Sequence, residues 1–277
     1  MTASISSRRD DLARQWRVTV DESSDTPSSL ITYGRRDGRP VVLKVVKAPG
    51  DEWRSGEVVA AFGGRGVIGV LEYVDGALLL ERADPGTSLV EPALSGRDEE
   101  STAILADVIS AMSSRGSVTA FPTVHDWGKA FEWYTATEDD QIPRHLVAQA
   151  SELYAALCGS QGATRLLHGD LHHYNVAFDR QRGWLAIDPK GVIGEVAYEL
   201  GAALRNPRER PDLFTNPAVI ERRLGRLTSR LNLDLGRAVS WGFAQAVLSA
   251  IWEVEDGYRL TPMNPGLVLA GAMRTLL

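Results

Sequence analysis

Two carboxylates and one carboxamide occur at short, fixed spacing in the segment LLHGDLHHYNVAFDRQRGWLAIDPKG, residues 166–191. Asn175 follows Asp170 by five positions, and Asp188 lies thirteen positions beyond Asn175. Carboxylate and amide oxygens are hard ligands, which Mg²⁺ prefers. In phosphoryl-transfer sites an aspartate serves as the base, while an asparagine and a later aspartate hold the metal. This spacing predicts that Asp170 is catalytic and that Asn175 and Asp188 bind Mg²⁺.

A β-hairpin is the element that would bring these groups together. The apolar runs 176–178 and 185–187 are joined by the polar connection 179–183, which ends in glycine. Short apolar runs flanking such a connection are typical of a hairpin. Asn175 at the start of one strand would then lie close to Asp188 at the end of the other.

The same segment allows a second interpretation. His168, Asp170 and His172 alternate along the chain, with His173 adjacent, so they could face one side of a strand and bind a metal. A hydrolase of this kind would hold Zn²⁺ or Mn²⁺ tightly. A third possibility is that the motif occurs by chance. An ATP-binding region elsewhere in the chain would favour phosphoryl transfer over both alternatives.

The first part of the chain predicts an antiparallel sheet with one unusual lysine. Strands are expected over 16–20, 29–33 and 41–46, with a hairpin turn at 36–39. Lys44 interrupts the apolar strand Val-Val-Leu-Lys-Val-Val, and a buried ammonium group is costly unless it is paired. Lys44 could be an edge-strand residue reaching water, or it could hold the phosphates of a nucleotide.

The next segment, 51–62, has helical spacing and offers the lysine a carboxylate. Glu57 follows Trp53 by four positions, so both should share the inward face of the helix. Glu52 is the alternative partner, although it lies off that face and could instead stabilise the N-terminus of the helix through the helix dipole. We therefore predict an ion pair between Lys44 and Glu57.

The pattern changes from strand to helix near residue 84. Apolar strands at 67–73 and 77–83 end at Asp-Pro-Gly, and helical periodicity dominates afterwards, as in 143–158 and 236–254. We expect an N-terminal lobe over residues 1–83 and a C-terminal lobe over residues 84–277.

A cluster of an aromatic residue and carboxylates ends the predicted helix at 236–254. Trp252 and Asp256 are four positions apart, with Glu255 beside them. Carboxylates at a helix C-terminus oppose the helix dipole. They could form an exposed acidic helix end, or a receptor for a cationic, hydroxyl-rich ligand.

Composition narrows the classes of function. The chain has 277 residues, of which 44% are hydrophobic and 24% charged, and a formal net charge of −6. These values are typical of a folded globular protein and argue against nucleic acid as a partner. With Cys158 as its one cysteine, no secretory signal and no membrane-spanning run, the protein is expected to be cytoplasmic, as a monomer or weak dimer.

The segments HGDLHHYN, AIDPKGVIGE and WEVEDG resemble the aminoglycoside phosphotransferases, particularly the streptomycin 6-kinase and hydroxyurea phosphotransferase branch. The resemblance spans nearly the whole chain, and its specific motifs lie in residues 166–195. It implies a bilobal, protein-kinase-like α+β fold and transfer of a phosphoryl group from ATP or GTP, with Mg²⁺, to a small-molecule hydroxyl. It also implies that Lys44 and Glu57 position the triphosphate, that backbone groups from Glu81 to Ala83 bind the base, and that the Trp252 cluster binds the substrate.

The chain departs from the kinase pattern at three places. Segment 21–29, where protein kinases have a glycine-rich loop, contains no glycine but several Ser and Thr hydroxyls that could contact phosphate. Lys190 could touch phosphate or pair with Glu195. Tyr174, where relatives often have glycine, could narrow the substrate pocket. The acceptor could be streptomycin, hydroxyurea, a sugar or another metabolite, and a nucleotide-binding pseudokinase is a further alternative, which the complete set of site residues opposes.

Overall fold

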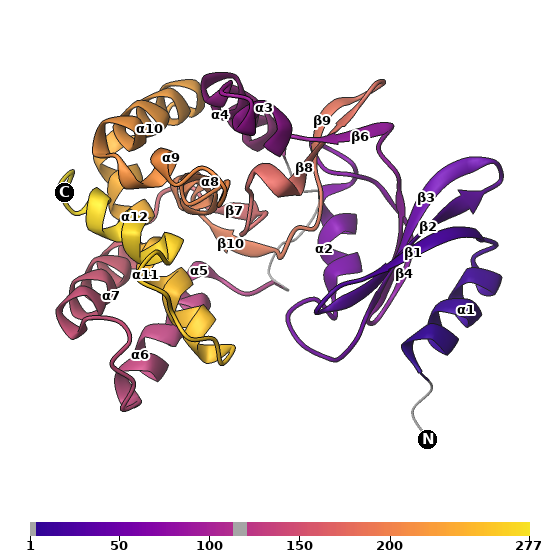
Figure 1. The fold of residues 1–277 in the computed structure, drawn as a ribbon, viewed down its shortest axis with the longest axis horizontal. Coiled ribbons are helices and arrows are strands. Elements are labelled where there is room, and N and C mark those ends of the chain that lie inside the picture. The colour runs from indigo at the N-terminus through magenta and orange to yellow at the C-terminus, as the bar shows by residue number, and fades with distance from the viewer. Residues whose placement is uncertain (1–3, 113–120) are drawn as a thin grey trace.

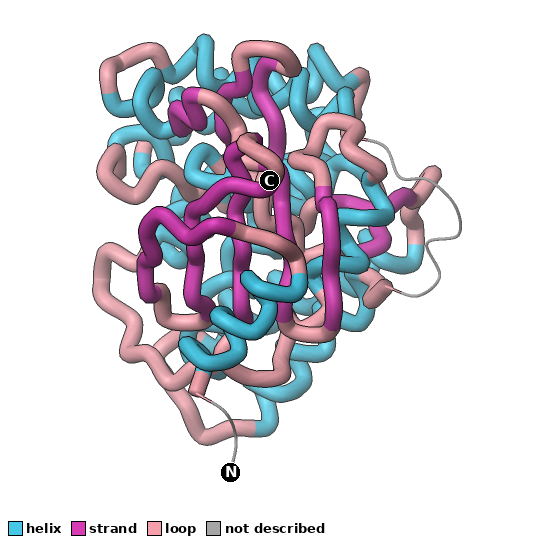
Figure 2. The backbone as a smooth tube through the Cα atoms, turned by 90° about the vertical axis from the view of Figure 1, so that its right-hand side faces the viewer, coloured by secondary structure: helices cyan, strands magenta, loops and turns pink. Residues whose placement is uncertain are grey.

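Alternating apolar residues build a five-stranded antiparallel sheet in the first third of the chain. The computed structural model describes residues 4–112 and 121–277. The strands of this sheet are β1 (Thr19–Asp25), β2 (Ser29–Arg36), β3 (Arg39–Val46), β4 (Val70–Val74) and β5 (Ala77–Glu81). They lie in the order β1-β2-β3-β5-β4, and Figure 2 shows them side by side. The predicted hairpin between the second and third strands is confirmed.

Helices cover both faces of the sheet. Helix α1 (Ile5–Gln15) packs Leu12 against one face, where it meets Leu43 and Val45 of β3. Helix α2 (Ser55–Phe62) packs against the opposite face. Because side chains alternate along a strand, Lys44 points to the face opposite Leu43 and Val45, which is the face that α2 covers. Figure 1 shows α1 and α2 on opposite sides of the sheet.

Strand β1 is longer than the sequence predicts. The expected strand 16–20 followed by an open segment 21–29 is wrong, because β1 continues to Asp25 in antiparallel register with β2. Ser23 and Thr32 share a hydrogen bond of 2.9 Å across the two strands. Cross-strand pairing thus overrides the low strand propensity of Ser and Asp, and few residues remain for a phosphate loop.

The second lobe is mostly helical and is organised around α11 (Leu235–Glu255). Trp241, Ala244 and Leu248 of this helix are fully buried. Helix α11 contacts α6 (Lys129–Ala136), α7 (Arg144–Gly159), α8 (Leu200–Leu204) and α12 (Pro265–Met273). Figure 1 shows these helices gathered around it, beside the lobe that holds the five-stranded sheet, as expected for a bilobal α+β fold.

Small sheets and further helices complete the described part of the chain. The remaining elements are β6 (Pro85–Ser88), α3 (Val90–Leu94), α4 (Asp98–Ala111), α5 (Val124–Trp127), β7 (Arg165–Leu167), the 3₁₀ helix η1 (His173–Asn175), β8 (Val176–Asp179), β9 (Gly183–Ala186), β10 (Val192–Gly194), the 3₁₀ helix η2 (Val196–Glu199), α9 (Asp212–Thr215) and α10 (Pro217–Leu231). Strand β8 pairs with both β6 and β9, and β7 pairs with β10. In the described part of the chain, no helix is both long and apolar enough to cross a membrane.

The change of sheet partner suggests where one lobe ends. Strand β5 ends at Glu81 inside the five-stranded sheet, whereas β6 begins at Pro85 and pairs with β8 of the other lobe. We propose that the boundary lies between Ala83 and Asp84, which corresponds to lobes over residues 1–83 and 84–277.

Candidate active site

The predicted hairpin forms and brings its two ends together. Strands β8 and β9 are antiparallel, with Val176 opposite Ala186. Just outside the strands, the Ile187 backbone N–H donates to the Asn175 carbonyl at 2.9 Å. Asn175 and Asp188 therefore lie at the same end of the hairpin, as the sequence predicts.

The carboxylate of Asp188 faces two ammonium groups. Asp188 has a φ of 57°, a left-handed conformation that is uncommon for residues other than glycine and often marks functional sites. Its Oδ1 lies 2.6 Å from Lys44 Nζ, and its Oδ2 lies 3.8 Å from Lys190 Nζ. Lys44, which lies on strand β3 of the N-terminal lobe, thus contacts the end of the hairpin in the C-terminal lobe.

Glu52, not Glu57, is the glutamate partner of Lys44, and the predicted pair is wrong. Glu52 Oε2 lies 2.9 Å from Lys44 Nζ, and its Oε1 lies 2.5 Å from Lys190 Nζ. Glu57 instead pairs with Arg54 at the surface. The helix begins at Ser55, after the turn that contains Glu52 and Trp53, so a helical face counted from Trp53 gives the wrong orientation.

Buried hydrogen bonds fix the loop that carries Asp170. The backbone N–H groups of His168 and Gly169 donate to the two carboxylate oxygens of Glu199 at 2.7 and 3.0 Å. The His168 ring lies between the backbone of Ile187 and that of Asp170, at 2.8 and 3.3 Å. Burial lowers the pKa of His168 to about 4, so its ring is neutral near pH 7 and braces the loop.

The Asp170 carboxylate lies between two basic side chains. Arg205 Nη2 is 3.4 Å from its Oδ1, and His172 Nε2 is 3.5 Å from its Oδ2. Burial raises the pKa of Asp170, but the hydrogen bond from His172 and the charge of Arg205 outweigh it and hold this pKa well below its usual range. Asp170 is therefore ionised near neutral pH and can accept a hydrogen bond from a hydroxyl group.

The oxygens at the hairpin end fit a magnesium ion. The Asn175 side-chain NH₂ group donates to the Asp170 carbonyl at 3.0 Å, so the amide oxygen is the atom that Asn175 can offer to a metal. The lysine contacts show that Asp188 presents both oxygens to cations. An oxygen-only donor set of this kind suits Mg²⁺.

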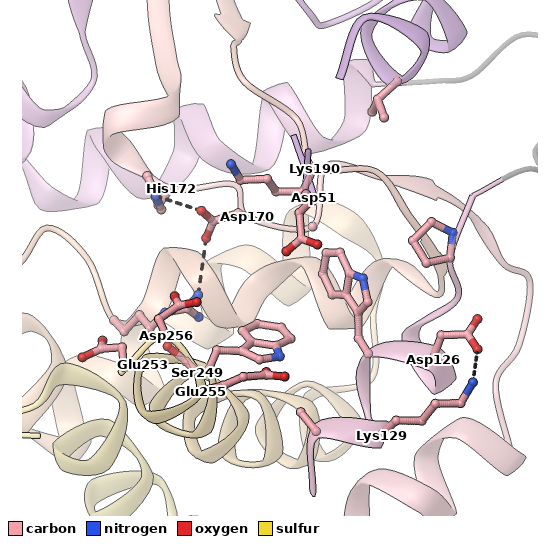
Figure 3. A pocket seen from close by; sticks show the side chains of 18 of the residues that line it. Asp51, Asp126, Lys129, Asp170, His172, Lys190, Ser249, Glu253, Glu255 and Asp256 are labelled. Atoms are coloured by element: carbon pink, nitrogen blue, oxygen red, sulfur yellow. Dashed lines mark hydrogen bonds and ion pairs between the residues drawn. The ribbon is translucent and has the colours of Figure 1, made fainter. Parts of the chain in front are cut away.

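A cavity of about 1070 Å³ opens beside Asp170. Carboxylates and cations both line it, and Figure 3 shows several of them pointing inward. The acidic residues are Asp51, Asp126, Asp170, Glu253, Glu255 and Asp256, and the basic ones are Arg54, Lys129, Lys190, Arg205 and Arg208. Trp252, Glu255 and Asp256, predicted from the sequence to bind the substrate, all lie in this lining, and Trp252 packs edge-on against Trp127 with ring centroids 5.5 Å apart.

The sequence profile of one protein family, described as "Aminoglycoside/hydroxyurea antibiotic resistance kinase", matches residues 15–257. This chain belongs to that family. It is therefore a small-molecule kinase, and the family resemblance drawn from the catalytic motifs is confirmed.

Alignments with named relatives cover most of this kinase. Streptomycin 3''-kinase from Klebsiella pneumoniae is 33% identical over 248 residues, covering 88% of this chain and 91% of that protein. Streptomycin 6-kinase from Streptomyces griseus is 30% identical over 267 residues, covering 92% and 84%. Hydroxyurea phosphotransferase from Kitasatospora aureofaciens is 33% identical over 235 residues, covering 80% and 65%.

Solved structures share the fold at lower identity, and they confirm the predicted bilobal, protein-kinase-like α+β fold. A thermostable mutant of aminoglycoside phosphotransferase APH(4)-Ia, in a ternary complex with ADP and hygromycin B, aligns with a TM-score of 0.65 at 19% identity over 96% of each chain. Choline kinase LicA from Streptococcus pneumoniae aligns with a TM-score of 0.62 at 13% identity, covering 97% of this chain and 98% of that one.

The geometry of this kinase does not favour the metallohydrolase interpretation. Both ring nitrogens of His168 contact backbone groups. His173 is buried with no exposed surface. Among the described residues, no group of three or more His, Cys, Asp or Glu side chains is arranged to bind a metal ion.

The residues predicted to bind the base, 81–83, lie in a short link between the lobes. Glu81 ends β5, where its backbone N–H donates to the Gly69 carbonyl at 2.9 Å, and its carboxylate pairs with Arg182 of the hairpin connection at 2.7 Å. Ala83 packs against the main core. The role of Glu81 and Ala83 in binding the nucleotide base stays a prediction.

Sequence reasoning missed Arg205 as a neighbour of Asp170. Its guanidinium is buried, and it also donates to Gln245 Oε1 at 2.9 Å. An arginine directly after the apolar run 200–204 was the available signal, because a buried charge requires partners.

Proposed function

We propose that this kinase transfers the γ-phosphoryl group of ATP to a hydroxyl group of an aminoglycoside of the streptomycin class. The observation that carries the proposal is the large cavity next to Asp170, which many charged side chains line. Aminoglycosides carry several hydroxyl groups and positive charges, which suit a lining rich in carboxylates. The streptomycin kinases among the relatives support the same class of acceptor.

Hydroxyurea is the second candidate, because a hydroxyurea phosphotransferase is also similar to this chain. Hydroxyurea is a molecule of five heavy atoms, and it would leave most of a 1070 Å³ cavity unfilled. Small ligands gain binding energy by burying most of their surface in a pocket of matching size. The cavity volume therefore favours the larger acceptor.

In the proposed reaction, Asp170 orients the acceptor hydroxyl and accepts its proton as the oxygen attacks the γ-phosphorus. Lys44 holds the α- and β-phosphates, with Glu52 fixing its position. Asn175 and Asp188 would hold Mg²⁺, which would neutralise negative charge on the phosphates when bound. Catalysis of this type depends on alignment and electrostatics, which a site between two lobes can supply.

Backbone groups of residues 81–83 are proposed to bind the base of the nucleotide, since these residues lie where β5 ends and the chain crosses to β6. We further propose that the kinase acts in the cytoplasm. The supply of ATP there and the single cysteine of the chain support that location.

The test measures ADP release in Mg-ATP with and without streptomycin, for the wild type and for Asp170→Asn. We expect streptomycin to stimulate turnover in the wild type, and the variant to lose about 10³-fold or more in kcat while it still binds ADP. If ATP binds but streptomycin gives no stimulation, the proposed acceptor is wrong, and hydroxyurea is assayed next. GTP in place of ATP, in the same assay, determines the nucleotide preference.

A further inference from the structure

Lys190 lies where the hairpin end meets the acceptor cavity. Its Nζ is 2.5 Å from Glu52 Oε1 and 3.8 Å from Asp188 Oδ2. The same side chain lines the cavity that contains Asp170, and Figure 3 shows Lys190 and Asp170 as neighbours at its edge. The alternative partner considered from the sequence, Glu195, is engaged elsewhere, with Arg237 at 2.6 Å.

Lys190 and Lys44 hold the same two carboxylates from different sides. Each lysine contacts one oxygen of Glu52 and one oxygen of Asp188. Lys44 lies on the sheet of the N-terminal lobe, whereas Lys190 lies two residues after Asp188 in the C-terminal lobe and borders the cavity. Among the described residues, these two lysines are the cations that pair with Asp188.

We propose that Lys190 is a catalytic residue that contacts the transferring phosphoryl group. This inference rests on the proposed function, in which the γ-phosphoryl group moves from a nucleotide at Lys44 and Asp188 to a hydroxyl group at Asp170. Lys190 is placed between these two positions. Arg205 also contacts Asp170, at 3.4 Å, but it lies on the side of α8, where it is held by Gln245.

The chemical step defines what the lysine does. The acceptor oxygen forms a bond to the γ-phosphorus, the bond from that phosphorus to the β–γ bridging oxygen breaks, and ADP leaves with the electron pair. The hydroxyl proton passes to the carboxylate of Asp170. Lys190 keeps its protons throughout, and its positive charge stabilises the negative charge on the equatorial phosphoryl oxygens.

The two lysines should therefore differ in kinetics. Lys44 holds the nucleotide before and during the reaction, whereas Lys190 acts mainly in the transition state. Loss of a transition-state contact lowers kcat with little change in KM. We expect Lys190→Met to lower kcat by about 100- to 1000-fold, with the KM for ATP within about threefold of wild type. Lys190→Arg keeps the charge and should retain more than a tenth of the wild-type kcat.

A purely structural role, in which Lys190 only fixes Glu52, predicts a different pattern. In that case Glu52→Gln would lower kcat as much as Lys190→Met does, and the double variant would have the same kcat as either single variant. A direct contact with phosphate predicts that Lys190→Met costs at least about tenfold more in kcat than Glu52→Gln, and that the double variant shows both losses.

A second measurement does not depend on turnover. ADP with aluminium fluoride mimics the planar phosphoryl group of the transition state, and a fluorescent ADP analogue reports its formation. We expect fluoride to slow the release of this analogue from the wild type in the presence of Mg²⁺ and Al³⁺. Lys190→Met should lose this fluoride effect while its affinity for the ADP analogue alone is retained, which also shows that the variant is folded.

Two results would overturn the proposal: a Lys190→Met variant that retains fluoride-dependent trapping, or one whose kcat loss equals that of Glu52→Gln without further loss in the double variant. The trapping assay separates this inference from the proposed acceptor. If streptomycin fails as a substrate but trapping still requires Lys190, the catalytic role of Lys190 stands and only the acceptor is wrong.

Discussion

Asp188 offers both carboxylate oxygens to cations, since Lys44 and Lys190 lie 2.6 and 3.8 Å from them. Asp188→Asn preserves the shape of the side chain but removes its charge, and the affinity for Mg²⁺ should fall. We expect the Mg²⁺ concentration that gives half-maximal activity to rise about tenfold or more. A Mg²⁺ titration at saturating ATP measures this, and an unchanged midpoint would show that Asp188 is not a metal ligand.

Trp252 gives a second prediction for a single residue. Its ring lines the cavity and is fixed edge-on by Trp127. An aromatic face attracts a cationic ligand by about 1–2 kcal/mol, so Trp252→Ala should raise the KM for streptomycin about tenfold, with the KM for ATP unchanged. Trp252→Phe, which keeps an aromatic face, is the matched control and should remain close to wild type. Equal KM values for streptomycin in all three proteins contradict the assignment.

The elements differ in how well the sequence alone predicted them. The β8–β9 hairpin and helix α11 were predicted because their signals are local, namely a polar turn between apolar runs and a long helical periodicity. The start of α2 was misplaced by four residues, because residues 51–54 form a turn without a strong capping signal. Because of this shift, Glu57 was predicted as the partner of Lys44, whereas the partner in the structure is Glu52.

Contacts between distant segments could not be predicted in the same way. Arg205 directly follows α8 and Glu199 ends η2, and both reach the loop that carries Asp170 only because these two elements pack beside it. Such pairs depend on how the elements pack, and no periodicity in the sequence encodes them. The residue types of the site were therefore predictable, whereas the residues that hold them in place were not.

The 3₁₀ helix η2 fixes the loop that carries Asp170. Its last residue, Glu199, accepts hydrogen bonds from the backbone N–H groups of His168 and Gly169. Glu199→Gln turns an NH₂ group toward one of these donors, so one buried N–H loses its acceptor. We expect the free energy of unfolding to fall by about 1–3 kcal/mol and kcat to fall as the loop loses its fixed position.

Urea denaturation measures this change in stability, and the exposed Glu221 on α10 offers a matched control. Glu221→Gln should alter the free energy of unfolding by no more than about 0.5 kcal/mol. If both variants are equally stable, Glu199 does not anchor the loop.

At the scale of the whole molecule, the two lobes are joined by charges and by backbone contacts. The Ala186 backbone of the hairpin exchanges hydrogen bonds of 2.9 Å with Gly66 and Ile68 of the N-terminal lobe. Arg182, from the hairpin connection, pairs with Glu81 at 2.7 Å. Glu52 adds a bridge at the active site, since it contacts Lys44 from its own lobe and Lys190 from the other.

This bridge makes the stability of the molecule depend on pH in a defined direction. Burial raises the pKa of Glu52, but the charges of Lys44 and Lys190 outweigh it and lower the pKa from 4.5 to about 2. Between these values the unfolded chain binds more protons than the folded one. The stabilisation from this carboxylate is therefore complete above about pH 4.5 and is lost as the pH falls toward 2.

Glu52→Gln removes the titrating group and tests this bridge. A shift of this size corresponds to about 3 kcal/mol, so the variant should be less stable than wild type by up to that amount at pH 7. The difference in the free energy of unfolding should shrink as the pH falls below 4.5, because Glu52 of the wild type then takes up a proton in the unfolded chain while it stays ionised in the folded one. Urea denaturation of both proteins at intervals from pH 7 to pH 3 measures it. A difference that stays constant over this range would mean that Glu52 gains no charge-dependent stability from the two lysines, and that the lobes are held together by the hairpin contacts alone.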